Sequence, residues 1–205
     1  MSALNGGGLA IREDGSHRHD RPFLVRNSLF AFNRTTQAGD NIGPTSDANG
    51  GGVYFVSYND VVLDSCTIVS NDSGYSMSGG VHHRWGGTIT NCVIAFNTVK
   101  GQPEPTSADA WSMDASCYQH CCIYPAVIDK FLAANGCVNA DPRFVDLANG
   151  EFDLRSGSPC RDAGIVEDWM TDACDIVGNP RVYGKGVDMG CYERNNFPGV
   201  MVIVF

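Results

Sequence analysis

The chain has 205 residues, of which 43% are hydrophobic, 18% are charged and 24 are glycine. This composition favours many short strands and turns over long helices, because helical domains carry more Ala, Leu, Glu and Lys and fewer glycines. The formal net charge of -9 argues against nucleic acid as a partner, since phosphate binding needs concentrated Lys and Arg. No membrane span is expected either, because no apolar run approaches the roughly 20 residues that cross a bilayer.

Two kinds of segment alternate along the first hundred residues. Glycine-led segments begin at Gly6, Gly50 and Gly79, with the sequences GGGLAIR, GGGVYFV and GGVHHRW. A segment that ends in asparagine follows each of them: LVRNSLFAFN, VLDSCTIVSN and ITNCVIAFN. Each glycine segment and the asparagine segment after it therefore form one repeating unit. The terminal asparagines are Asn33, Asn71 and Asn97.

Alignment of these units brings apolar or small residues together at short alternating offsets, which is the period of strands. Insertions at residues 37–49 and 101–108 lie between the segments without disturbing that register. We predict an all-β fold, a right-handed parallel β-helix (solenoid) of a few coils, whose equivalent residues stack about 4.8 Å apart and whose asparagines form a ladder. An antiparallel sandwich is the alternative, because alternation alone does not fix topology. The matched positions include Val25 with Leu63 and Ile89, Ser28 with Cys66 and Cys92, and Phe30 with Ile68 and Ile94.

The repeat stops after Pro105. We expect residues 1–105 to form the coils, with their Gly-rich and Asn-ladder repeats. Residues 106–205 are then the last coil or coils and an irregular C-terminal capping region, within the same structural domain. The open end of such a stack exposes apolar side chains and unpaired strand edges, so a cap is needed. The closing segment PGVMVIVF, residues 198–205, is expected to be one last strand.

The second half carries the order DPRFVD, NGEFDLRSGSPCRDAG, DIVGNPR and VDMGCYE. This order resembles the C-terminal part of bacterial right-handed parallel β-helix repeat proteins of the pectate-lyase-like superfamily, of the choice-of-anchor Q domain type. The GGG, FAFN and IAFN signatures are similar to the same proteins and to polymorphic outer-membrane protein repeats. The resemblance covers about residues 5 to 193. It implies a pectin lyase-like fold in a secreted or surface-attached module of a larger polypeptide, and it implies no reaction.

Nine cysteines are many for a reducing compartment, and none form a CxxC pair with zinc-finger spacing. We expect a secreted or cell-surface protein whose leader is absent from this chain, which is itself a piece of a longer polypeptide. A cytosolic protein with many buried thiols is the alternative. Cys66 and Cys92 share one register, which allows a disulfide or a buried thiol stack. Cys174 and Cys191 stand where the family more often has Thr and Ala, and the resemblance suggests that they pair with each other.

The segment GGVHHRWGG, residues 79–87, groups several reactive side chains. Alignment of the glycine segments places His83 in the core, and Trp85 lies too near a bend to assign. Tyr54 and His82 share an outward register, and Arg84 follows on the same face. These three residues would form an aromatic and cationic strip suited to stacking on a sugar ring and holding an acidic group. Ordinary surface is the alternative reading of the same strip.

Carboxylates give weaker signals. Arg26, Asp64 and Thr90 share an outward register, and the lone Asp64 is expected to be solvated or paired with Arg26.

His120 and Cys121 are adjacent on a strand and point to opposite faces, so they do not form a nucleophile and base. We expect no cofactor and no metal, with calcium left open as the alternative at six aspartates that read better as turn-capping residues. These are Asp141, Asp146, Asp153, Asp162, Asp175 and Asp188.

Two classes of function follow. The first is a non-catalytic secreted or cell-surface module, structural or adhesin-like, whose partner is a polysaccharide or cell-surface glycan. The second is a carbohydrate-active enzyme of the polysaccharide lyase type acting on an acidic polysaccharide. Such a lyase needs a base that removes the proton α to a carboxylate, for which His82 and Arg84 are weak candidates. The outward face lacks the two carboxylates of a glycoside hydrolase, so the balance favours the first class.

Overall fold

The computed structural model is all-β, with almost no helix. Within the described residues the helices are single 3-10 turns, η1 (Ala115–Cys117), η3 (Leu147–Asn149) and η4 (Asp168–Met170). The loop predicted at 37–49 and the strand predicted at 198–205 lie outside the described residues, as does most of the loop predicted at 101–108. The structure describes residues 6–12, 21–36, 50–56, 61–74, 78–103, 109–112, 114–125, 135–183 and 186–194.

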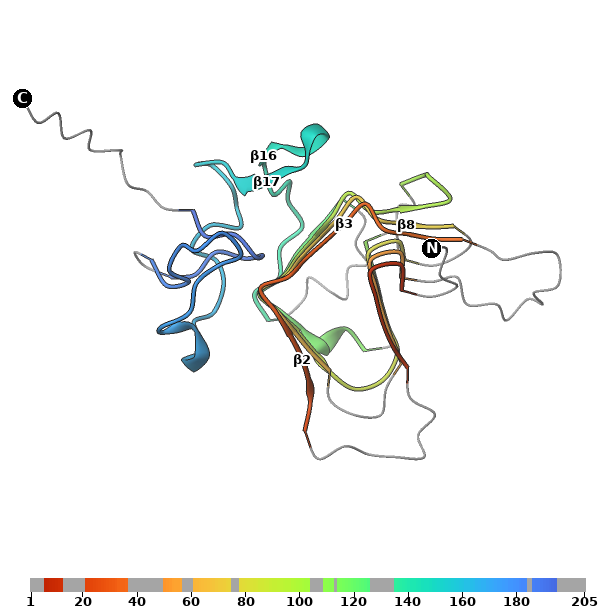
Figure 1. Ribbon diagram of the computed structural model, residues 1–205, viewed down its shortest axis with the longest axis horizontal. Coiled ribbons are helices and arrows are strands. Elements are labelled where there is room, and N and C mark those ends of the chain that lie inside the picture. The colour runs from red at the N-terminus through yellow and green to blue at the C-terminus, as the bar shows by residue number, and fades with distance from the viewer. Residues whose placement is uncertain are drawn as a thin grey trace, which may run out of the picture.

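Four parallel sheets run through the first 125 residues (Figure 1). Each strand pairs with the strand at the same place in the next unit, so the sheet orders are β1-β5-β9-β13, β2-β6-β10-β14, β3-β7-β11-β15 and β4-β8-β12. This arrangement is consistent with the parallel β-helix class and excludes an antiparallel sandwich for these strands. The strands are β1 (Leu9–Arg12), β2 (Phe23–Arg26), β3 (Leu29–Ala31), β4 (Arg34–Thr35), β5 (Val53–Val56), β6 (Val61–Asp64), β7 (Thr67–Val69), β8 (Asp72–Ser73), β9 (Val81–His83), β10 (Thr88–Thr90), β11 (Val93–Ala95), β12 (Thr98–Val99), β13 (Ala110–Ser112), β14 (Tyr118–Gln119) and β15 (Cys122–Tyr124).

The predicted strand register is confirmed. Val25 pairs with Leu63, and Leu63 pairs with Ile89 on its other side. The glycine segments pair in the same way, with Tyr54 opposite His82 and the inward residue Phe55 opposite His83. The paired residues lie from 26 to 44 positions apart in sequence. The glycine and asparagine repeats alone were sufficient to align the units that contain them.

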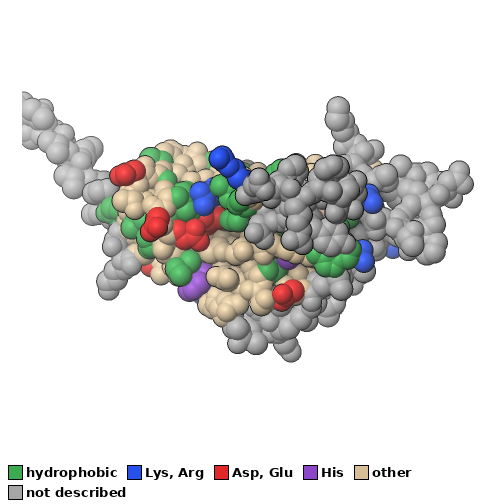
Figure 2. Space-filling view, turned by 90° about the horizontal axis from the view of Figure 1, so that it is seen from below, with side chains coloured by type: hydrophobic (Ala, Val, Ile, Leu, Met, Phe, Trp, Pro, Cys, Tyr) green, Lys and Arg blue, Asp and Glu red, His purple; other side chains and the backbone are tan. Residues whose placement is uncertain are grey.

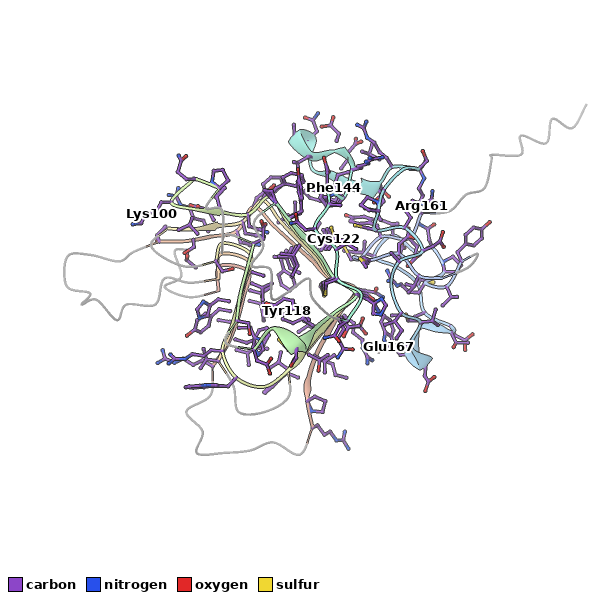
Figure 3. All side chains as sticks on the ribbon, turned by 180° about the vertical axis from the view of Figure 1, so that it is seen from behind. Lys100, Tyr118, Cys122, Phe144, Arg161 and Glu167 are labelled. Carbon is purple, nitrogen blue, oxygen red and sulfur yellow. The ribbon has the colours of Figure 1, made fainter. Side chains whose placement is uncertain are left out.

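Inward side chains fill the space that the sheets enclose. Leu63, Ile68, Ile89 and Ile94 are fully buried there, and Figure 3 shows Tyr118 within the same interior. Full burial of each such aliphatic side chain contributes about 1.5–3 kcal/mol. Alternation along the strands therefore produces a continuous core through successive units.

The asparagines at the ends of the repeats form a hydrogen-bonded column. The Oδ1 atom of Asn71 accepts from the backbone N–H and the Nδ2 of Asn33, both at 2.9 Å. The Oδ1 atom of Asn97 accepts the same two bonds from Asn71. Asp109 accepts both bonds from Asn97 and ends the column, because a carboxylate accepts without donating. The amides thus satisfy backbone groups of a turn in which Asn71 and Asn97 are buried.

A second column stands at the corner between β2 and β3 and its equivalents. Asn27, Ser65, Asn91 and His120 all adopt left-handed backbone conformations, with φ between 47° and 53°. Asparagine tolerates this conformation better than most residues because its short polar side chain bonds locally. Residues of this column bind the C-terminal part of the chain. Asn27 Nδ2 donates to the carbonyl of Cys174, and Asn91 exchanges two bonds with the backbone of Ile165.

Residues 141–183 and 186–194, the C-terminal lobe, pack against the side of the stacked sheets (Figure 1). The strands β16 (Phe144–Asp146) and β17 (Glu151–Leu154) form its one antiparallel pair. Phe144 and Phe152 are buried against outward residues of β7 and β11, among them Val69 and Val93. The lobe covers a flank of the stack, whereas residues 135–138, which also belong to the predicted capping region, bond to residues 120–123 of the last coil. Apolar residues on the outward positions of β7, β11 and β15 explain why that flank needs cover.

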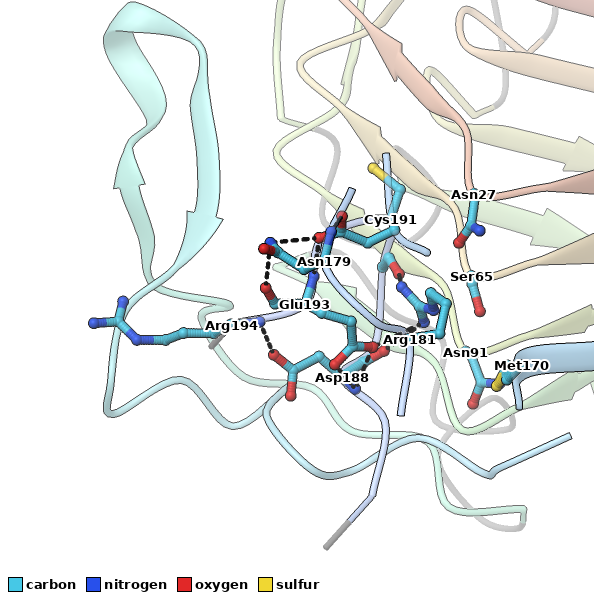
Figure 4. A network of polar contacts seen from close by, with 12 residues as sticks. Asn27, Ser65, Asn91, Met170, Asn179, Arg181, Asp188, Cys191, Glu193 and Arg194 are labelled. Carbon is cyan, nitrogen blue, oxygen red and sulfur yellow. Dashed lines mark hydrogen bonds and ion pairs between the residues drawn. The ribbon is translucent and has the colours of Figure 1, made fainter. Parts of the chain in front are cut away.

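The lobe has its own buried polar centre, drawn in Figure 4. Arg181 is 0% exposed, donates to the carbonyls of Asp188 and Gly190, and pairs with the Glu193 carboxylate at 3.2 Å. Burial raises the pKa of Glu193, and the neighbouring Arg181 guanidinium opposes this by favouring the carboxylate. A buried cation needs such partners, because leaving it uncompensated costs several kcal/mol.

Candidate binding site beside Trp85

The segment 79–87 places its side chains on two faces of β9, as alternation requires. His83 points into the core, where it is 2% exposed and its ring lies 4.3 Å from that of Phe55. Its Nε2 is bonded to the carbonyl of Gly86, and its Nδ1 lies 3.1 Å from the hydroxyl of Ser112. Burial lowers the pKa of His83. The interior position inferred from the alignment is confirmed.

The predicted strip of Tyr54, His82 and Arg84 is not an exposed surface. The Tyr54 and His82 rings stack with centroids 5.2 Å apart, as adjacent register positions allow, but each residue is only 4% exposed. Burial, His83 and Arg84 together lower the pKa of His82 to about 3. The expectation of outward exposure was wrong for the first two residues, because an outward register on a strand does not make a side chain accessible when other parts of the fold cover it.

Arg84 is the exposed member of that set, and its guanidinium lies 4.6 Å from the ring centroid of Trp85. Trp85 itself is 38% exposed and has a φ of 76°, and Gly86 and Gly87 continue the bend with φ of 62° and 90°. Three successive left-handed residues turn the chain sharply after β9. The bend therefore presents the indole at the surface instead of burying it.

A cavity of about 280 Å³ lies against this bend. Its walls come from the bend, which includes Trp85, and from the segment around η1, which includes the exposed residue Asp114. Sequence reasoning missed this site because Trp85 had no register partner and Asp114 belongs to no repeat. The consecutive glycines after Trp85 were the available signal. The lining residues are His83, Trp85, Gly86, Gly87, Asp114 and Cys117.

A second hollow of about 270 Å³ lies between β11 and the lobe, beside Phe96 and Phe144. Its arginines are already used within the fold. Arg155 donates from Nε and Nη2 to the carbonyls of Phe144 and Val145, and Arg143 donates to the carbonyl of Gly157. These bonds hold the β16 and β17 pair together, so we assign this hollow a structural role.

Two carboxylates meet where the lobe touches β6. The indole N–H of Trp169 contacts both Asp64 Oδ2, at 2.7 Å, and Glu167 Oε2, at 3.1 Å. Asp64 is 0% exposed and pairs with Arg26 at 3.6 Å, so of the two roles predicted for it the ion pair is observed. Burial and Asp64 raise the pKa of Glu167. With Asp64 enclosed by protein partners, this cluster attaches the lobe, as the position of Glu167 at the boundary in Figure 3 illustrates.

All nine cysteines are free thiols. Cys66 and Cys92, one suggested disulfide, are both fully buried, and their thiols approach backbone carbonyls, including those of Asp64 and Thr90. Stacked side chains of one register point in the same direction, which favours the thiol stack. Cys174 and Cys191, the other suggested disulfide, are not joined either. Cys174 is exposed, whereas Cys191 is buried and its backbone N–H donates to Thr67.

Four of the six aspartates considered as calcium ligands accept hydrogen bonds from backbone amides. Asp141 accepts from the N–H of Arg143, and Asp146 accepts from the N–H of Asn149. Asp175 and Asp188 each accept from several backbone N–H groups of the lobe. Within the described residues no three His, Cys, Asp or Glu side chains are grouped as a metal would require. These contacts are those of turn-capping residues.

The face shown in Figure 2 presents no continuous basic surface among its coloured side chains, and acidic groups gather over the lobe. No described helix has both the length and the hydrophobicity to cross a membrane. Comparisons of the chain with protein-family models, with curated proteins and with solved structures found no match.

Proposed function

We propose that the chain is a right-handed parallel β-helix module of the pectate-lyase-like superfamily, of the choice-of-anchor Q domain type. In this proposal the module belongs to a secreted or cell-surface polypeptide and is structural or adhesin-like. It binds a polysaccharide or cell-surface glycan and does not cleave it. The in-register parallel sheets and the asparagine column support the scaffold part of the proposal, because both recur with the sequence repeat.

The observation that carries the binding part is the cavity beside Trp85. An indole face packs well against the C–H groups of a sugar ring, and an ionised carboxylate accepts hydrogen bonds from sugar hydroxyls. Trp85 and Asp114 supply these two groups in one cavity. Its volume of about 280 Å³ is near the lower end of ligand pockets, roughly 300 Å³, so we expect recognition of one terminal or side-chain sugar.

The lyase alternative has less support. A general base must reach the proton that it removes, and His82 is 4% exposed. Its pKa of about 3 also makes it a weak base. Arg84 is accessible, and its guanidinium lies over the Trp85 ring, a position that suits ligand binding.

Binding to a panel of neutral and acidic polysaccharides, measured by affinity electrophoresis, tests the proposal. We expect retardation by at least one polymer, lost in Trp85→Ala and in Asp114→Ala and kept in Trp169→Phe, which lies at the lobe boundary. β-Elimination absorbance on the same acidic polymers tests the alternative. Binding that survives both cavity variants would reject the assigned site, and elimination that is lost in Arg84→Ala would reject the proposal that the glycan is bound without being cleaved.

A further inference from the structure

The cavity beside Trp85 contains a thiol in contact with an imidazole. Cys117 Sγ lies 3.1 Å from His83 Nδ1, although the two residues belong to η1 and β9 and are 34 positions apart in sequence. The same thiol lies 2.8 Å from the carbonyl of Asp114, so its proton has two acceptors. A nucleophile within hydrogen-bond distance of a base is the arrangement that covalent catalysis requires.

The tautomer of His83 is fixed by its other nitrogen. Nε2 is bonded to the carbonyl of Gly86, and a carbonyl only accepts, so Nε2 carries the proton. Nδ1 then presents a lone pair toward Cys117 and toward the Ser112 hydroxyl. The Gly86 carbonyl therefore orients the ring as the third member of a nucleophilic site does.

Access separates this thiol from others in the core. Cys117 is partly exposed and lines the cavity together with His83. Ser112 also reaches Nδ1 but is only 2% exposed, and the core thiols Cys66 and Cys92 are 0% exposed. Cys117 is thus the group through which the imidazole can act on a molecule in the cavity.

The Cys117 thiol and the His83 imidazole are both uncharged at neutral pH. Burial raises the pKa of Cys117 to about 12 and lowers the pKa of His83. The other titratable or charged groups that interact with the pair are His82, Asp114, Tyr118 and Cys121. A neutral thiol is a weak nucleophile, so a reaction at neutral pH needs transfer of its proton to Nδ1 as the sulfur attacks.

We propose that Cys117 and His83 form a nucleophile and base pair that accepts small acyl groups from carboxylic esters entering the cavity. The sulfur attacks the ester carbonyl carbon while its proton passes to Nδ1. The carbon–oxygen bond to the alcohol then breaks, and the alcohol oxygen takes the proton from Nδ1, leaving a thioester on Cys117. Water, activated by Nδ1 in the same way, hydrolyses the thioester to the acid and restores the thiol. This activity is independent of whether the cavity also binds a glycan.

The probe is p-nitrophenyl acetate, with nitrophenolate release followed by absorbance and the acetylated cysteine located by peptide mass spectrometry. We expect acetylation of Cys117 in the wild type, no acetylation at that position in Cys117→Ala, and a rate at least tenfold lower in His83→Gln. Cys174→Ala removes an exposed thiol that has no described histidine contact and is expected to leave the Cys117 rate unchanged. Circular dichroism establishes whether each variant is folded.

The pH profile of the wild type gives a second readout that does not depend on a variant. Because His83 is already deprotonated at neutral pH, the acetylation rate at Cys117 should be nearly constant between pH 7 and 9. A thiol that reacts only after ionising, with a pKa of about 12, would instead gain tenfold in rate with each pH unit. That tenfold rise, absence of acetyl from Cys117, or an unchanged rate in folded His83→Gln would overturn the proposal.

Discussion

Substitution of Asn71 by Ala removes the middle of the asparagine column. The side chain takes part in four hydrogen bonds, two accepted from Asn33 and one donated to each of Asn97 Oδ1 and the Phe30 carbonyl. Asn71 is 0% exposed, so water cannot replace these partners. At about 1 kcal/mol for each bond, the free energy of unfolding should fall by about 4 kcal/mol. That loss is a large share of the roughly 5–15 kcal/mol that stabilises an ordinary domain.

Urea unfolding followed by circular dichroism measures this loss. Asn149→Ala is the matched control, because Asn149 is exposed and donates one side-chain bond to Asp146, and we expect it to cost less than about 1 kcal/mol. Asp109→Asn should keep the column, because an amide oxygen can still accept the two bonds that Asn97 donates. An Asn71→Ala cost no larger than that of the control would refute the structural role of the column.

Three further predictions concern buried charge, pH and thiols. Arg181→Met should destabilise by about 3–5 kcal/mol because it breaks a buried network, whereas Arg34→Met breaks an exposed pair and should cost about 0–1 kcal/mol in the same urea assay. The pKa of Glu167 is raised in the folded state, so its stabilising contribution is present in acid and is lost as pH rises through that pKa. The melting temperature of the wild type should therefore fall relative to that of Glu167→Gln as pH rises. Parallel plots of melting temperature against pH for the two proteins would contradict this. Native alkylation should label exposed Cys174 and spare buried Cys66, with a mass loss of two hydrogens marking any disulfide instead.

The repeats made the scaffold predictable. Glycine and asparagine recur at equivalent places, and one alignment of them gave the pairing of Val25, Leu63 and Ile89. The inward position of His83 followed from the same alignment. Such predictions depend on alternation and stacking, which are local consequences of strand geometry.

The site was not predictable in the same way. Whether Tyr54 and His82 are exposed depends on what covers an outward face, and no repeat encodes that. The cavity combines Trp85, which follows a strand, with Asp114 and Cys117, which precede another strand outside the repeat region. Contacts between a repeat and a segment that interrupts it leave no periodic signal in the sequence. The flank position of the lobe escaped prediction for the same reason.

The most direct test of the central claim is the fluorescence of Trp85 during glycan binding. The chain has three tryptophans, so a variant with Trp111→Phe and Trp169→Phe leaves Trp85 as the reporter. Titration with a polysaccharide that binds the wild type should shift its emission to shorter wavelength and saturate at the affinity found for the wild type, because a sugar ring would displace water from the indole. Saturable binding of that polysaccharide with unchanged Trp85 emission would contradict the claim that the glycan occupies this cavity.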